Sequence, residues 1–308
     1  MGIYMRILHM FNWDLKDIIK EVESIKAQGF DAIQINPIQP LKEDNKDNWW
    51  LSYQPCGFNI GNQYGTRQDL INLCNACNYF DIKVIADVIC NHVAGDIDGS
   101  LNAHQSVDAN IKNNEWFFKE KKQIQNWDDR YQVTEWCMGL PSLNLDNYDL
   151  QDIVFVFLVD LVNCGVSGFR FDAAKCMKLP NEGSDFLQKV KNMSDYLNLY
   201  NYGEVINEHD HLIDQYSQYF KVATDNYNGH YKDNIVSYVE SHDCYLEFGY
   251  TKNKPSSLIN HEYYNLTNEY GNTLYYARPF DNAWKDEIVR KANYVNKKHH
   301  VMVLKRVH

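Results

Sequence analysis

Short apolar runs, each rich in β-branched or aromatic residues, recur along the chain between polar segments. Runs of this kind, bounded by turn residues, are typical of buried β-strands. The pattern therefore predicts eight strands, which lie within residues 4–10, 30–38, 82–89, 165–172, 199–206, 219–226, 234–243 and 272–279.

Helical patterns fill many of the intervals between these runs. Asp14 to Gln28 is followed by Gly29, Thr66 to Tyr79 opens with a threonine suited to capping, and Asp149 to Cys164 is followed by Gly165. A regular alternation of strand and helix indicates a parallel sheet. Eight such strands predict an α/β fold, a closed TIM (β/α)8 barrel of about 250 residues whose functional side chains lie at the carboxyl ends of the strands.

Residues 91–145 interrupt this rhythm, because they are polar, rich in Asn and Trp, and without helical periodicity. We interpret them as an irregular inserted B domain after strand three, with the catalytic barrel in residues 1–90 and 146–308. A chain of 308 residues then has the length of one barrel plus the insertion, and no carboxy-terminal β-sandwich domain is expected. The interval between the sixth and seventh strands is too short for a full helix, so the sixth barrel helix should be shortened.

Composition narrows the classes of ligand that the chain could bind and the cellular compartments in which we expect it. The chain has 44% hydrophobic residues, a formal net charge of −11 and a pI near 5.4, which argues against nucleic-acid binding. It shows neither an apolar run long enough to span a membrane nor a signal peptide, so we expect a cytoplasmic protein, with an extracellular one as the alternative. Eight sparse cysteines are typical of reduced thiols, and Cys74 and Cys77 lack a second pair for zinc.

Ionisable residues stand at the ends of four of the predicted strands. They are Asp87 and His92 in "DVICNH", Arg170 and Asp172 in "GFRFD", Glu204 in "YGEV", and Glu240, His242 and Asp243 in "VESHD". A single aspartate at a strand end is usually a cap or a turn residue. Several carboxylates near one barrel mouth need compensating partners and usually indicate a site.

This set of residues suits glycoside hydrolysis with retention, in which one carboxylate attacks the anomeric carbon and another protonates the leaving oxygen. Arg170 lies two positions before Asp172, so strand periodicity places both side chains on one face. The arginine can then hold the aspartate ionised, while Phe169 and Phe171 point toward the surrounding helices.

The four charged segments, in this order and spacing, resemble the sequence regions of the α-amylase family, glycoside hydrolase family 13. "GLPSLN" is similar to a further region near the end of that family's B domain, and "GFDAIQINPIQP", "WWLSYQPCGFNIGNQYGT" and "GFRFDAAK" resemble animal and bacterial saccharifying α-amylases. The similarity runs from about Ile7 to Pro279.

The resemblance implies a role for each matching residue. Asp172 would be the nucleophile, Glu204 the general acid and base, and Asp243 the group that stabilises the distorted sugar. Two nearby carboxylates should raise the pKa of Glu204. The residues implied to orient the nucleophile or bind substrate are Arg170, His92, His242, Tyr53, Gln54, Trp49, Trp50 and Lys175.

The sequence also departs from the family pattern at its ion sites. A structural calcium is implied at Asn91, at the Thr134 carbonyl and at Cys176 through its carbonyl, but Ser142 stands where an Asp is expected, which removes a hard anionic ligand. Calcium binding therefore stays open. Ser241 replaces the expected Asn, so no chloride is expected.

The resemblance favours an endo-acting hydrolase of α-1,4 bonds in starch, glycogen or maltooligosaccharides. Two alternatives stay open, namely a glucan transferase or α-1,6-glucosidase with the same three acids, and a catalytically silent glucan-binding protein. Missing elements would leave apolar barrel surface for a protein partner or for self-association.

Overall fold

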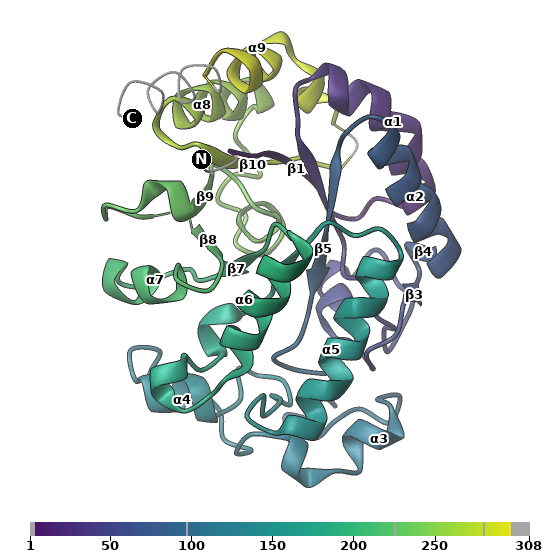
Figure 1. The fold of residues 1–308 in the computed structure, drawn as a ribbon, viewed down its shortest axis with the longest axis vertical. Helices are drawn as coiled ribbons and strands as arrows, with labels where there is room; N and C mark the ends of the chain where they lie inside the picture. The colour runs from purple at the N-terminus through teal and green to yellow at the C-terminus, as the bar shows by residue number, and fades with distance from the viewer. Residues whose placement is uncertain (1–3, 97, 225, 280, 297–308) are drawn as a thin grey trace.

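Eight parallel strands close into a barrel, which confirms the predicted TIM architecture (Figure 1). The computed structural model describes residues 4–96, 98–224, 226–279 and 281–296. The first strand pairs with both the second and the last, which completes the ring. In chain order the barrel strands are β1 (Arg6–Met10), β2 (Ala32–Ile35), β5 (Lys83–Val88), β6 (Gly168–Phe171), β7 (Tyr202–Glu204), β8 (Lys221–Thr224), β9 (Ile235–Tyr238) and β10 (Asn272–Tyr276).

The three helices that the sequence predicted form at the expected places. Thr66 caps the second of them through a capping box with Asp69, and Gly29 and Gly165 take up left-handed backbone conformations just after the other two. The helices surround the barrel (Figure 1). Their bounds are α1 (Leu15–Ala27), α2 (Arg67–Tyr79), α5 (Tyr148–Asn163), α6 (Phe186–Leu197), α7 (Asp210–Tyr216), α8 (Ser256–Glu269) and α9 (Glu287–Lys291).

The connection from β8 to β9 is short, as the sequence predicted. Between Thr224 and Ile235 the described residues, which leave out residue 225, hold one 3-10 turn, Lys232–Asn234, and no α-helix. The sixth helix of the barrel is therefore reduced to this turn.

The segment between β5 and α5 includes residues 91–145, which we interpret from the sequence as an insertion. It contains two short helices, α3 (Ala109–Lys112) and α4 (Arg130–Glu135), and a 3-10 turn at Glu115–Phe117. A second small element, the antiparallel pair β3 (Gly61–Asn62) and β4 (Gly65–Thr66), precedes α2. None of the described helices is long and apolar enough to cross a membrane.

Strand periodicity divides the core into an inner and an outer part. Ile7 of β1 packs inside the barrel with Tyr202 of β7, whereas Leu8, Phe169 and Phe171 pack in the outer cluster between strands and helices. This arrangement confirms the predicted orientation of the two phenylalanines and leaves inner positions for polar groups.

One buried polar group of the barrel wall is an arginine on β1, on the outer side of the strand with Leu8. Arg6 is fully buried, and its Nη1 donates to the carbonyl oxygens of Tyr270 at 3.1 Å and Gly271 at 2.7 Å, and to Oγ1 of Thr273 at 3.2 Å. The closure between β1 and β10 thus includes a charged contact beside the backbone ladder.

The eight cysteines are free thiols, and seven of them are buried. Cys74 and Cys77 lie on α2, where burial raises the pKa of both thiols, that of Cys77 to about 12. Among the described residues, no group of three or more His, Cys, Asp or Glu side chains is arranged to hold a metal ion.

Candidate active site

The carboxyl ends of β5, β6, β7 and β9 meet at a pocket of about 280 Å³. Ten of the eleven residues predicted as catalytic or substrate-binding line it, and they come from separate segments of the chain. These residues are Trp49, Trp50, Tyr53, Gln54, His92, Arg170, Asp172, Glu204, His242 and Asp243.

Arg170 lies at the base of this pocket and contacts three carboxylates. Its Nη1 donates to Oδ1 of Asp172 at 2.7 Å and to Oδ1 of Asp87 at 2.8 Å, and its Nη2 contacts Oε1 of Glu204. Asp87 and Arg170 are register partners on β5 and β6. Arg170 is 5% exposed, so these charge-assisted hydrogen bonds form in a region of low dielectric constant.

The acids at the pocket have raised pKa values for a common reason. Burial is the largest cause of the raised pKa of Glu204, the charge of Asp172 raises it further, and Arg170 opposes both. Burial likewise raises the pKa of Asp243 to about 8, with a further contribution from the charge of Glu204. The sequence attributed the shift of Glu204 to neighbouring carboxylates alone, whereas loss of solvent is the first cause.

Two neutral histidines flank the acids. His242 Nε2 lies 3.1 Å from Oδ1 of Asp243, and His92 Nε2 lies 2.9 Å from the carbonyl oxygen of Tyr53 and 4.0 Å from Oδ2 of Asp172. Burial lowers the pKa of both imidazoles. Within the described part of the chain, Nδ1 of each ring is buried and has no hydrogen-bond partner.

Tyr53 has a fixed orientation in the pocket. Its ring stacks on His242 with a centroid distance of 5.1 Å and an interplanar angle of 11°, and its hydroxyl donates to Oδ2 of Asp87 at 2.9 Å. Asp87, for which the sequence suggested no role, therefore anchors both Tyr53 and Arg170.

Lys175 is the predicted binding residue that the structure places beside the pocket and outside its lining. Its ammonium donates to the carbonyl oxygen of Ile206 at 3.1 Å, lies 3.9 Å from Oε1 of Glu208, and sits 4.7 Å from the centroid of the Trp127 ring. The Lys175 ammonium therefore has its polar partners within the protein.

Six further residues line the pocket that the sequence did not indicate. Met138 and Leu140 come from the insertion, just before the "PSLN" residues, and Glu247 and Phe248 follow Asp243 in an irregular turn. Neither segment has a period that predicts which side chains face inward. Ala173 and Ile206 complete the lining.

Glu240, the remaining acid at a strand end, points elsewhere. It is 2% exposed and pairs with Arg278, whose Nε donates to Oε2 at 2.8 Å and whose Nη2 donates to Oε1 at 2.9 Å. The buried ion pair with Arg278 explains why an acid stands at this strand end, and Glu240 needs no role in the pocket.

Two of the three oxygens that the resemblance assigned to calcium have other partners. Lys119 Nζ donates to Oδ1 of Asn91 at 2.9 Å and to the carbonyl oxygen of Cys176 at 2.8 Å. The hydroxyl of Ser142, which stands in place of the expected Asp, donates to the carbonyl oxygen of Leu140 at 3.3 Å. The hydroxyl of Thr134 donates to the carbonyl oxygen of Arg130 at 2.8 Å. Calcium needs six to eight oxygen ligands, commonly with carboxylates, so this donor set does not fit it.

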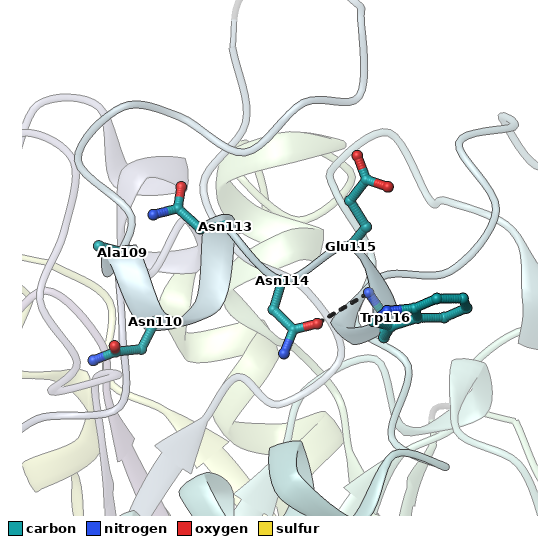
Figure 2. A pocket seen from close by; sticks show the side chains of 6 residues that line it. All are labelled: Ala109, Asn110, Asn113, Asn114, Glu115 and Trp116. Carbon is teal, nitrogen blue, oxygen red and sulfur yellow. Dashed lines mark hydrogen bonds between the residues drawn. The ribbon is translucent and has the colours of Figure 1, made fainter.

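A second hollow lies on the insertion, and Figure 2 shows the six residues that line it. The Asn114 side chain accepts a hydrogen bond from the Trp116 backbone at 3.2 Å, while the Glu115 side chain and the Trp116 ring point in different directions. Because these polar groups do not converge on one point, we assign no chemistry to this hollow. Its lining comprises Ala109, Asn110, Asn113, Asn114, Glu115 and Trp116.

Comparison with solved structures supports the fold. An α-amylase from Geobacillus thermoleovorans, solved in complex with acarbose, has a TM-score of 0.76 at 18% identity, covering 96% of this chain and 78% of that one. A mutant of α-amylase I from Eisenia fetida, solved with maltohexaose, has a TM-score of 0.72 at 17% identity, covering 90% and 67%. At these identities the likeness shows the fold alone.

Comparison of sequences is more specific. An α-amylase from Clostridium acetobutylicum is 33% identical over 246 residues, which cover 75% of this chain and 32% of that protein. An α-amylase-related protein from Drosophila serrata is 31% identical over 182 residues, or 56% and 37% of the two chains. The chain thus spans about a third of the length of these curated relatives. Residues 10–299 match the family described as "Alpha amylase, catalytic domain", and the chain therefore belongs to that family.

Proposed function

We propose that the protein is a retaining, endo-acting hydrolase of α-1,4 bonds in starch, glycogen or maltooligosaccharides. The observation that carries this proposal is the meeting of Asp172, Glu204 and Asp243 around one pocket, with Arg170 in contact with the first two. Family membership supports the same chemistry.

In the proposed mechanism, Asp172 attacks the anomeric carbon and forms a covalent glycosyl intermediate. Arg170 holds this carboxylate in place through the 2.7 Å hydrogen bond. Glu204, whose pKa burial raises, holds a proton and gives it to the leaving glycosidic oxygen, then takes one from the water that releases the sugar. Asp243, at the same pocket, stabilises the distorted sugar ring.

The rest of the pocket supports binding of a chain of sugar rings. Tyr53 and Trp49 offer aromatic faces for the apolar faces of sugars, and the imidazoles of His92 and His242 line the same pocket beside the acids. Two structural neighbours were solved with acarbose and with maltohexaose, which favours a similar ligand here.

Glucan transfer is the second candidate, and a specific comparison favours it. A cyclomaltodextrin glucanotransferase, CldA, has a TM-score of 0.73 with this chain at 15% identity. Transfer uses the same covalent intermediate and differs in the acceptor, which is a sugar hydroxyl in place of water.

Incubation of the purified protein with maltoheptaose tests the proposal. We expect shorter maltooligosaccharides whose new reducing ends first appear as the α-anomer in proton NMR. Glu204→Gln should lower the rate by about 10²- to 10⁴-fold, because it removes the proton donor. Glu23→Gln, an exposed position on α1, is the matched control and should leave the rate unchanged.

Three outcomes would overturn the hydrolase proposal. A ladder of products longer than maltoheptaose would identify a transferase. Binding of acarbose in calorimetry without any turnover would identify a silent glucan-binding protein. An unchanged rate in Glu204→Gln would remove Glu204 from the mechanism.

A further inference from the structure

The side chain of Lys119 connects three segments that are far apart in the sequence. Its ammonium donates to Oδ1 of Asn91, which follows β5, and to the carbonyl oxygen of Cys176, in the turn Ala174–Cys176 that follows β6. Asn91 and Cys176 are buried. Lys119 lies in the middle of the insertion and Asn91 at its start, so one amine joins the body of the insertion to the end of β5 and to the loop of the barrel that follows β6.

From these contacts we infer that the Lys119 ammonium takes the place of a calcium ion as the positive charge that fastens the insertion to the barrel. The two acceptor oxygens are among the three that the family resemblance assigned to calcium. An ammonium is a compact charge with three donors, which suits carbonyl and amide oxygens. A divalent ion on the same oxygens would lie beside this fixed positive charge and be repelled by it.

The charges of the exchanged groups support the substitution. Replacing a divalent ion by a lysine removes one positive charge, and replacing the expected Asp by Ser142 removes one negative charge. The sum of the formal charges at this site is therefore unchanged. Ser142 supplies no carboxylate, and its hydroxyl instead donates to the Leu140 carbonyl.

The backbone places Lys119 at the position that the exchange requires. The Lys119 amide donates to the carbonyl oxygen of Ser142 at 2.9 Å, and Phe118 and Leu143 form an antiparallel bridge beside it. The lysine therefore starts next to the residue that replaces the missing acid and reaches from there to Asn91 and Cys176.

A second cation strengthens the same junction. Arg130 of α4 donates to the carbonyl oxygen of Lys175 at 2.6 Å and pairs with Glu182 at 2.7 Å. Val133 of α4 packs with Ala173 and Cys176 in a small buried cluster. The loop after Asp172 is thus held by side chains that cannot dissociate, so we infer that its order does not depend on a metal.

Thermal unfolding with and without a chelator tests this inference, and it does not depend on the proposed activity. The wild-type protein should unfold at the same temperature in EDTA, in buffer and in millimolar calcium chloride, and should give no calcium-binding heat in calorimetry. A melting temperature that EDTA lowers and calcium restores would overturn the inference.

Substitution of the lysine gives an independent test. Lys119→Met keeps the length and removes the charge, and should lower the melting temperature by about 3–8 °C. Lys121→Met is the matched control, because Lys121 is exposed on the same segment and contacts Asn102. Equal melting temperatures for the two variants would contradict the role of Lys119.

The double variant Lys119→Met, Ser142→Asp removes the amine and restores the acid. We expect calcium to raise its melting temperature and EDTA to reverse the effect. A double variant that ignores calcium would show that these oxygens do not form the exchanged site. If Lys119→Met does not fold, the wild-type chelator and calcium measurements still decide the question.

Discussion

Nη1 of Arg170 lies 2.7 Å from Oδ1 of Asp172, because two residues that are two positions apart at the end of a strand have their side chains on the same face. The same guanidinium contacts Asp87 and Glu204. One buried guanidinium therefore offsets the negative charges of three acids, and the burial of each acid depends on this same partner. Removing it would leave several buried carboxylates facing one another.

Arg170→Met should accordingly destabilise the fold by about 3–5 kcal/mol at pH 7, because it strands buried charges. The loss should be smaller at pH 4.5, where the carboxylates take up protons more readily. Urea unfolding at the two pH values measures both. A variant within about 1 kcal/mol of the wild type at pH 7 would contradict the proposed dependence.

Asp243 should make stability depend on pH. Burial raises its folded-state pKa to about 8, while an aspartate in an unfolded chain titrates near 3.8. The folded protein thus holds this proton more tightly, so the contribution to stability is complete below about pH 4 and is lost as the pH rises toward 8.

Asp243→Asn carries no titrating proton at this position. Relative to the wild type, its unfolding free energy should therefore increase between pH 4.5 and pH 8, as urea unfolding would record. Asp44→Asn, at an exposed position, is the control for the loss of one charge. A constant difference between Asp243→Asn and the wild type at every pH would argue against the raised pKa.

The pair of Glu240 and Arg278 should be structural. Arg278 also donates to the carbonyl oxygens of Thr251 and Lys254, both at 2.9 Å, so it fixes the loop that follows Phe248. Arg278→Met should cost about 3–5 kcal/mol of unfolding free energy. Arg290→Met, on an exposed face of α9, should change it by less than about 1 kcal/mol in the same chemical denaturation.

Phe248 should contribute to substrate affinity and not to the chemical step. It lines the pocket, is half exposed, and stacks on Tyr250 with a centroid distance of 5.2 Å. Phe248→Ala should raise KM for maltoheptaose about fivefold, which corresponds to about 1 kcal/mol, with kcat nearly unchanged. Tyr79→Ala on α2 is the matched control. A loss confined to kcat would assign Phe248 a different role.

The sequence predicted the barrel well because its signals are local. Each apolar run forms a strand, and a period of two places Arg170 and Asp172 on one face while Phe169 and Phe171 pack outward. The pocket residues followed from strand ends and from the family resemblance.

The parts that sequence reasoning missed depend on distant contacts. Lys119 lies in an irregular segment, and nothing local indicates that its amine reaches Asn91 and Cys176. Lys175 adjoins a recognisable motif, yet Trp127 and Glu208, which come from other segments, draw its ammonium away from the pocket. Such pairings are set by tertiary packing and have no periodic signature.

Arg6 on the first strand contacts residues at the start of the last strand, and this contact has a consequence for biosynthesis. The Tyr270 carbonyl that accepts its hydrogen bond lies 264 residues later in the chain. While the ribosome is still translating, β1 has neither its edge partner nor the acceptors for its cation. The ring cannot close until β10 has left the exit tunnel, so the nascent chain must be kept from aggregating until then.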